Sequence, residues 1–233
     1  MPQNQYKHIF FDLDHTLWDF EKNASETLQH LFNHFNLQQL KLFTLEQFLQ
    51  AFHKVNRQLW AAFDNGKVDK RYIRGERFKI ISEHLKISPD LLPAELGELY
   101  LAQCPSKSHV MPFAHDILNY LKKKYELHVI TNGFNDVQLV KIDSSRLADF
   151  FHEIITADSC GYQKPHKQIF DHALKVVDAD DHECIMIGDN LSTDIEGARN
   201  AGIDQIFYNP YNLSHNEEVT YEVNCLSELK QLL

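Results

Sequence analysis

The stretch HIFFDLDHTLWDF, residues 8–20, decides the fold. Its apolar run at residues 9–13 is typical of a strand that is buried on both faces of a parallel sheet. Two aspartates, Asp12 and Asp14, stand one residue apart where this strand ends. Taken alone, aspartates after a strand can be ordinary turn or cap residues, so their meaning depends on the rest of the chain.

Four further short β-rich runs follow, at residues 127–131, 153–157, 184–188 and 205–208. Helix-like stretches separate them, at residues 136–146, 166–177 and 193–201. This alternation predicts βαβ units. We therefore expect an α/β fold with a doubly wound, Rossmann-like parallel sheet.

A long helical region interrupts this pattern after the first strand. Residues 25–35, 45–63, 69–85 and 91–102 carry apolar side chains at three- and four-residue spacing. Prolines, which break helices, follow at Pro105 and Pro112. The pattern predicts a core domain of residues 1–18 and 105–233, with an inserted helical domain of residues 19–104.

The composition narrows the class of protein. The chain has 233 residues, of which 43% are hydrophobic, and its four cysteines form no CxxC pair, so they suggest neither a zinc site nor a disulfide framework. The formal net charge of −10 argues against a nucleic-acid polymer as partner. We find no signal-peptide pattern and no membrane-length apolar run, and we expect a cytoplasmic protein that is a monomer or a homodimer.

Polar residues follow several of the expected strands, and in a parallel sheet the carboxyl ends of the strands meet at one edge. These residues are Asp12, Asp14, Thr131, Asn132, Lys164, Asp189 and Asp194. Crowded carboxylates require a cation, and hard oxygen ligands favour Mg²⁺. Lys164 and the groups at residues 131–133 supply positive charge and donors for a phosphoryl group. The sequence predicts a metal and phosphate site.

Four motifs in this order resemble those of the haloacid dehalogenase-like (HAD) phosphohydrolases. DLDHT at residues 12–16 resembles the first motif, Thr131 in VITNG the second, Lys164 in QKP the third, and GDNLSTD at residues 188–194 the acidic fourth. The resemblance spans nearly the whole chain. It implies a phosphomonoester as the small-molecule substrate and an aspartyl-phosphate intermediate.

The resemblance also implies roles for the acidic residues. Asp12 would be the nucleophile and a ligand of Mg²⁺, and a free aspartate is ionised at neutral pH without help. Asp14 would be the general acid and base, with a pKa raised by its surroundings, and its backbone carbonyl would bind the metal. Asp189 would complete the metal site, and Asp194 would orient Lys164 or a metal-bound water.

The remaining core residues would act on the substrate itself. Thr131 would hydrogen-bond the transferred phosphoryl group, Asn132 would lie against the substrate, and Lys164 would mask the phosphoryl charge.

The inserted helices match the position of the small helical cap of this family. The segment VNRQLWAAFDNGKVDKRYIRGERF, residues 55–78, and ITNGF at residues 130–134 are similar to those of bacterial YjjG-type pyrimidine nucleoside 5′-monophosphatases. By this resemblance the substrates would be nucleoside monophosphates, including noncanonical pyrimidines. Trp60 would stack on a base, and Asn56, Arg74 and Arg77 would bind the sugar or the phosphate.

Other activities fit the same core. A hexose-phosphate mutase or a sugar-phosphate phosphatase would share every core motif. A dehalogenase fits less well, because its site would lack the second aspartate and the metal. A phosphonate hydrolase would need a lysine in the cap, and Lys54, Lys67 and Lys70 are the candidates. A module that binds a phosphorylated ligand without turnover would have no need of Asp14.

Overall fold

The computed structural model describes residues 6–233. They divide into two compact units. One contains the described residues up to Asp19 together with Ser108–Leu233, and the other is Phe20–Lys107.

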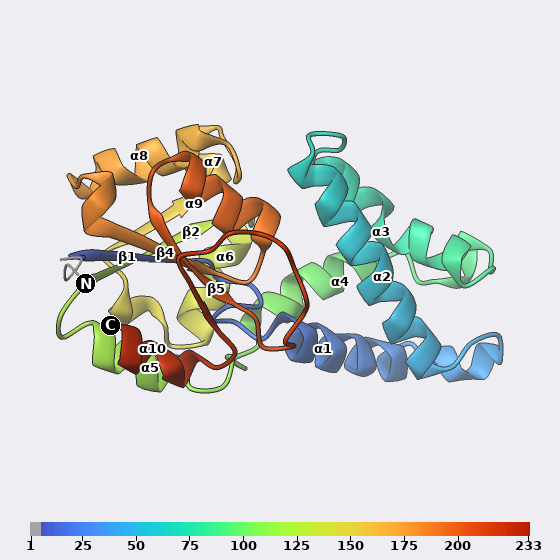
Figure 1. Cartoon of the computed structure of the whole chain (residues 1–233). Helices are drawn as coiled ribbons and strands as arrows, with labels where there is room; N and C mark the ends of the chain where they lie inside the picture. The colour runs from blue at the N-terminus through green and yellow to red at the C-terminus, as the bar shows by residue number, and fades with distance from the viewer. Residues whose placement is uncertain (1–5) are drawn as a thin grey trace. The chain divides into compact units, whose positions relative to one another are not determined.

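The first unit is built on a six-stranded sheet in the order β3-β2-β1-β4-β5-β6, and every neighbouring pair is parallel (Figure 1). The strands are β1 His8–Phe11, β2 Glu126–Thr131, β3 Glu153–Thr156, β4 Cys184–Gly188, β5 Asp204–Tyr208 and β6 Tyr221–Val223. The predicted α/β class is confirmed. The sequence pattern missed β6 because three residues are too few to show a period.

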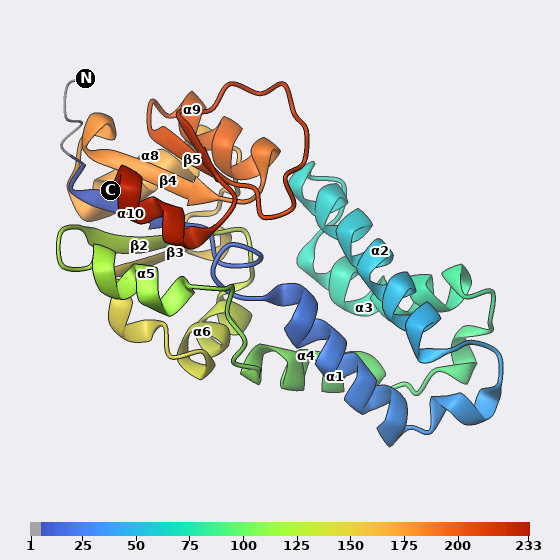
Figure 2. The same ribbon diagram turned by 60° about the horizontal axis from the view of Figure 1, so that its bottom comes forward.

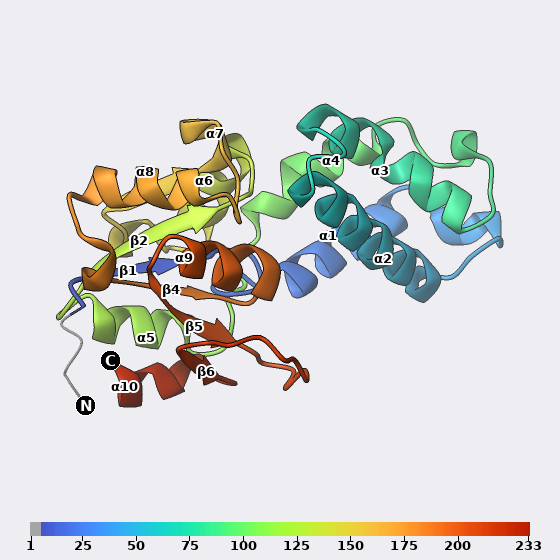
Figure 3. The same ribbon diagram turned by 45° about the horizontal axis from the view of Figure 1, so that its top comes forward.

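Helices cover both faces of this sheet. They are α5 Ala114–Leu121, α6 Asn135–Ser144, α7 Ala157–Cys160, α8 Lys167–Val177, α9 Glu196–Asn200 and α10 Leu229–Leu232. Figures 1 and 3 show α8 and α9 on one face and α5 and α10 on the other. Under α8 and α9, apolar side chains such as Phe10, Ile130, Phe170 and Met186 form a fully buried core.

The stretch at residues 193–201 differs from the single helix that its sequence predicts. It begins with a π-helical turn, Leu191–Ile195, and only Glu196–Asn200 is α-helical. The cause lies at the start of the segment, where the Asn190 side chain accepts hydrogen bonds from the backbone N–H groups of Ser192 and Thr193. A wide first turn results, which turns Asp194 back toward Asn190.

The second unit consists of the helices α1 Phe20–His34, α2 Leu45–Asp64, α3 Lys70–His84 and α4 Leu96–Gln103. Figure 2 shows α2 beside α3. Helix α2 begins with a capping box of Thr44 and Gln47, and Asp69 caps α3. The helix predicted at 91–102 starts later, at Leu96, because Pro93 cannot donate a backbone hydrogen bond within it.

The register of the parallel strands gathers the functional segments at one edge. Phe11 of β1 pairs with Val129 of β2 and with Ile187 of β4, so the segments that follow these strands emerge side by side. None of the helices in the part of the chain that the structure describes combines the length and the apolarity needed to cross a bilayer.

Candidate active site

Lys164 stands at the centre of the polar groups at this edge. Its side chain is 2% exposed, and its Nζ lies 2.5 Å from Asp12 Oδ1 and 2.7 Å from Asp194 Oδ1. A third hydrogen bond, of 2.8 Å, goes to the backbone carbonyl of Ile130. Burial alone would lower the pKa of Lys164, but the two carboxylates outweigh it and raise the pKa. Lys164 is therefore a fixed cation beside Asp12.

Three carboxylates lie together beside this cation, and two of them, Asp12 and Asp194, pair with it. The oxygens of Asp12, Asp189 and Asp194 lie within 4.8 Å of one another. Burial and the neighbouring negative charges raise the pKa of Asp12 well above its ordinary value, although Lys164 opposes the shift. Burial and the charge of Asp194 raise the pKa of Asp189 to about 7. The positive charge of Lys164 alone therefore does not offset the effects that raise the pKa of Asp12. The three carboxylates form an all-oxygen donor set, which fits a hard divalent cation.

Asp14 lies in a different environment from Asp12. Lys141 Nζ is 2.7 Å from each of its carboxylate oxygens, and Gln138 Nε2 donates a hydrogen bond of 2.9 Å to Oδ2. Burial alone would raise the pKa of Asp14, but Lys141 and Gln138 outweigh burial and lower it. The sequence-based expectation was a raised pKa. The direction differs because a cation from α6, which the motif does not contain, pairs with the carboxylate.

Gln138 and Lys141 are the site residues that the motifs did not identify. Both are buried on α6, and Gln138 also donates to Thr131 Oγ1 over 2.7 Å. This contact needs Gly133, because a Cβ at that position would lie 2.0 Å from Gln138 Nε2. The glutamine and the lysine, three residues apart, share one helix face with Ile142, but this spacing does not show which polar residues of a helix turn inward.

Asn132 fixes the loop that carries Lys164. Its Nδ2 donates to the backbone carbonyl of Lys164 over 2.9 Å, and its Oδ1 accepts from the backbone N–H of Lys164 over 2.7 Å. The Lys164–Pro165 peptide bond is cis. Both ends of the Asn132 amide are thus used to position the lysine, whereas the motif suggested a contact with substrate.

The fourth motif places its two aspartates by close backbone packing. A Cβ at Gly188 would lie 2.2 Å from Asp194 Oδ2, so only glycine admits Asp194 here. The backbone N–H of Asn190 donates to that same oxygen over 3.1 Å. Asp189 accepts a hydrogen bond of 3.2 Å from Thr16, which ties the fourth motif to the first.

The candidate substrate residues of the insert all lie on α2 and α3 of the helical unit. Asn56 is 5% exposed, and its Oδ1 has no hydrogen-bond partner among the described residues. The ring of Trp60 packs edge-on against Phe63 at 5.4 Å. Arg74 is partly buried on α3.

Arg77 is the most enclosed of these residues. It is 5% exposed, and its guanidinium lies over the rings of Phe52 at 5.7 Å and Tyr100 at 5.4 Å. Burial lowers its pKa. This position gives Arg77 a packing role within the helical unit.

Comparisons with known proteins agree with this arrangement. A family model for haloacid dehalogenase-like hydrolases matches residues 6–202. Pyrimidine 5′-nucleotidase YjjG of Escherichia coli is 32% identical over 97% of this chain and 96% of its own length. Pyrimidine 5′-nucleotidase PynA of Streptococcus pneumoniae is 30% identical over 98% of this chain and 95% of its own length.

A solved structure extends the likeness to three dimensions. HAD-hydrolase YfnB of Bacillus subtilis, in a crystal form bound to magnesium, superposes with a TM-score of 0.85 at 28% identity, covering 98% of each chain. The family model spans most of this chain. This chain belongs to the haloacid dehalogenase-like hydrolases.

Proposed function

We propose that this protein is a Mg²⁺-dependent phosphomonoester hydrolase that acts on nucleoside 5′-monophosphates, pyrimidine or noncanonical ones, through an aspartyl-phosphate on Asp12. The observation that carries the proposal is the position of Asp12, between the fixed Lys164 cation and two further carboxylates at the carboxyl edge of the sheet. The names of its two full-length relatives support the substrate class.

The residues present fit Mg²⁺ by the chemistry of their donors. The carboxylates of Asp12 and Asp189 and the backbone carbonyl of Asp14 would hold the ion, while Asp194 remains on Lys164. When bound, Mg²⁺ supplies positive charge to the phosphoryl oxygens and to the crowded carboxylates.

The chain's own residues would carry the two chemical steps. An oxygen of Asp12 attacks phosphorus, the bond from phosphorus to the ester oxygen breaks, and its electron pair leaves on that oxygen, which takes a proton from Asp14. Water then attacks the aspartyl-phosphate, gives its proton to Asp14, and releases inorganic phosphate with Asp12 restored. Lys164 and the hydroxyl of Thr131 stabilise the charge on the transferred group.

Substrate selection would belong to the helical unit. We place Trp60 against the base, and Arg74 at the sugar or phosphate. Asn56 and Arg77 are kept as candidate contacts, although the burial of Arg77 over the Phe52 and Tyr100 rings favours packing. Closure of such a unit over a site would exclude bulk water during the reaction.

A sugar-phosphate phosphatase is the second candidate. Glyceraldehyde 3-phosphate phosphatase of Pyrococcus furiosus is 36% identical over 53% of this chain. A hexose-phosphate mutase would use the same core, but it would form a bisphosphate intermediate and release no net phosphate.

The cellular setting remains a prediction. The four cysteines, all within the described residues, form no disulfide with one another, which fits the reducing cytoplasm. We expect a monomer or a homodimer, which light scattering in solution would determine.

The test is phosphate release from nucleotides, sugar phosphates and p-nitrophenyl phosphate, with Mg²⁺ and with EDTA. We expect Mg²⁺-dependent release that is fastest on pyrimidine 5′-monophosphates. Asp12→Asn should lower kcat by several orders of magnitude and should yield no acid-stable phosphoprotein. Near-normal turnover by Asp12→Asn would exclude the covalent mechanism, and fastest release from sugar phosphates would favour the second candidate.

A further inference from the structure

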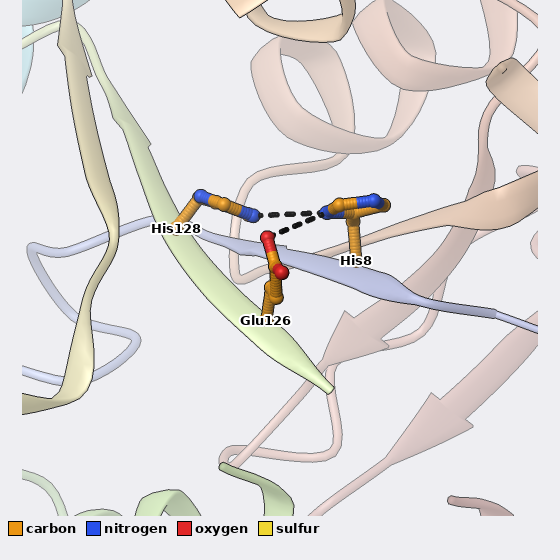
Figure 4. Close-up of side chains that lie close together, drawn as sticks. All are labelled: His8, Glu126 and His128. Carbon is orange, nitrogen blue, oxygen red and sulfur yellow. Dashed lines mark hydrogen bonds and ion pairs between the residues drawn. The ribbon is translucent and has the colours of Figure 1, made fainter. Parts of the chain in front are cut away.

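A second group of potential metal ligands lies at the amino ends of β1 and β2. Asp12 lies at the other end of these strands, beyond their carboxyl ends. His8 and Glu126 are partners in the parallel register, and His128 follows Glu126 by two residues. Residues two apart on a strand share a face, so the register brings all three side chains together. Figure 4 shows the His8 ring facing both His128 and the Glu126 carboxylate.

The distances match the edges of a metal coordination sphere. His8 Nδ1 lies 3.2 Å from His128 Nε2 and 3.6 Å from Glu126 Oε2. Ligand atoms on a tetrahedron with bonds of about 2.0–2.1 Å are separated by roughly 3.3–3.4 Å. Ligand atoms from all three residues lie within 4.8 Å of one another. A small shift of side chains would centre an ion among them.

Hydrogen bonds alone do not satisfy this group. If His8 Nδ1 carries the proton, the neutral His128 ring must carry its own proton on Nδ1, which is buried and has no partner. If His128 Nε2 carries the proton instead, the lone pair of His8 Nδ1 faces the Glu126 carboxylate. The second arrangement sets two acceptors against each other. A cation would accept the lone pairs of His8 Nδ1, His128 Nε2 and Glu126 together, with the His128 proton on Nδ1 as in the first arrangement.

We propose that His8, Glu126 and His128 form a binding site for a divalent transition-metal ion, of which Zn²⁺ is the type. Two imidazoles and one carboxylate are the ligands of open three-residue zinc sites, whereas Mg²⁺ prefers an all-oxygen set. Glu126, whose side chain is 56% exposed, leaves the fourth position to solvent.

Cys184 of β4 is not part of this site. It pairs with His8 in the register, but it belongs to the buried apolar core that also contains Phe10 and Met186. The bound ion would join β1 to β2 and stabilise the sheet. Because the site lies at the opposite strand ends from Asp12, its occupancy should leave hydrolysis unchanged.

The test is titration of the full chain with Co²⁺ and Zn²⁺ in excess Mg²⁺. We expect one equivalent of Co²⁺ to give visible absorption of a four-coordinate ion, and Zn²⁺ to raise Tm. Glu126→Gln and His8→Gln should each weaken binding by more than the roughly 10–100-fold that loss of an outer-shell partner costs a metal site. Phosphatase activity of Glu126→Gln with Mg²⁺ should equal that of the wild type.

Two controls separate this site from other ligands. The exposed His30 and His34 rings stack at 6.2 Å on α1 and could also bind Co²⁺. A variant with both His30→Gln and His34→Gln removes this pair and should still bind one equivalent of Co²⁺. Asp189→Asn alters the acidic cluster and should also keep it. The proposal would be overturned if the wild type bound Co²⁺ no more tightly than Glu126→Gln does. It would also be overturned if the double variant of His30 and His34 lost Co²⁺ binding. Glu126→Gln carries the test even if His8→Gln does not fold.

Discussion

Replacing Asp189 by asparagine should stabilise the metal-free protein. The pKa of Asp189 is about 7 in the folded chain against an ordinary value of 3.8. Its raised pKa means that the folded state holds the proton more tightly than the unfolded state. Stability is therefore lost as the pH rises from about 4 to about 7, where the carboxylate must ionise among its neighbours.

The size of the effect follows from the shift. Three pKa units at about 1.36 kcal/mol each give an upper limit of about 4 kcal/mol. Asp189 is partly exposed and shares the repulsion with Asp12 and Asp194, so we expect about 2 kcal/mol at pH 8. For a unit of this size, that corresponds to a rise in Tm of about 4–8 °C.

The assay is thermal unfolding in EDTA between pH 4.5 and pH 8, values chosen on either side of the expected window, about pH 4 to 7. The chain has two tryptophans, so a Trp60→Phe background leaves Trp18, fully buried in the α/β unit, as the fluorescent reporter. Asp149→Asn, an exposed change in the same unit, is the matched control. With Mg²⁺ the order should reverse, since a ligand at 100 times its Kd adds about 2.7 kcal/mol to the wild type.

The reasoning would be refuted by either of two results. One is an Asp189→Asn protein that unfolds no later than the wild type at pH 8 without metal. The other is a stabilisation that does not vary with pH, because that would trace to packing and not to charge.

Three further predictions concern single residues. Lys141→Met should raise the pKa of Asp14, because the paired cation is gone, and the alkaline limb of the kcat/KM profile, where the general acid loses its proton, should move to higher pH; an unmoved limb would contradict the role of the pair. Gly188→Ala should lower kcat by about 100-fold or more, because the new Cβ displaces Asp194 from Lys164, and wild-type kcat would refute this. We expect Arg74→Ala to raise KM for nucleotides about tenfold or more with little change in kcat. Unchanged kinetics on every nucleotide would remove Arg74 from the proposed site.

The parallel sheet was predictable because its strands are continuous apolar runs. β1 and β4 are buried along their whole length, and such runs leave little choice of structure. The gathering of Asp12, Lys164 and Asp194 was predictable for a related reason, since a strand that ends in a polar residue places it at the shared carboxyl edge.

Contacts made by helix faces were harder to foresee. The Lys141 pair with Asp14 joins residues 127 positions apart, and its existence depends on the rotation of α6 above the sheet. Periodicity predicts where a helix lies but not which of its polar residues turns inward. The same limit applies to Arg77, which the resemblance places at the sugar or the phosphate and whose guanidinium lies over the rings of Phe52 and Tyr100. It applies also to His8 and Glu126, which meet only through strand register.

The two aspartates of the first motif lie one residue apart, yet their pKa values shift in opposite directions. Burial and nearby carboxylates raise that of Asp12 despite Lys164, whereas Lys141 outweighs burial and lowers that of Asp14. The proposed mechanism needs the reverse, an ionised Asp12 and a protonated Asp14. Ligand charge accounts for both changes, because a divalent cation favours the Asp12 carboxylate and a phosphoryl dianion near Asp14 favours its acid form. In the free protein both shifts thus run against the reactive protonation state, and a bound cation and phosphomonoester would together oppose them.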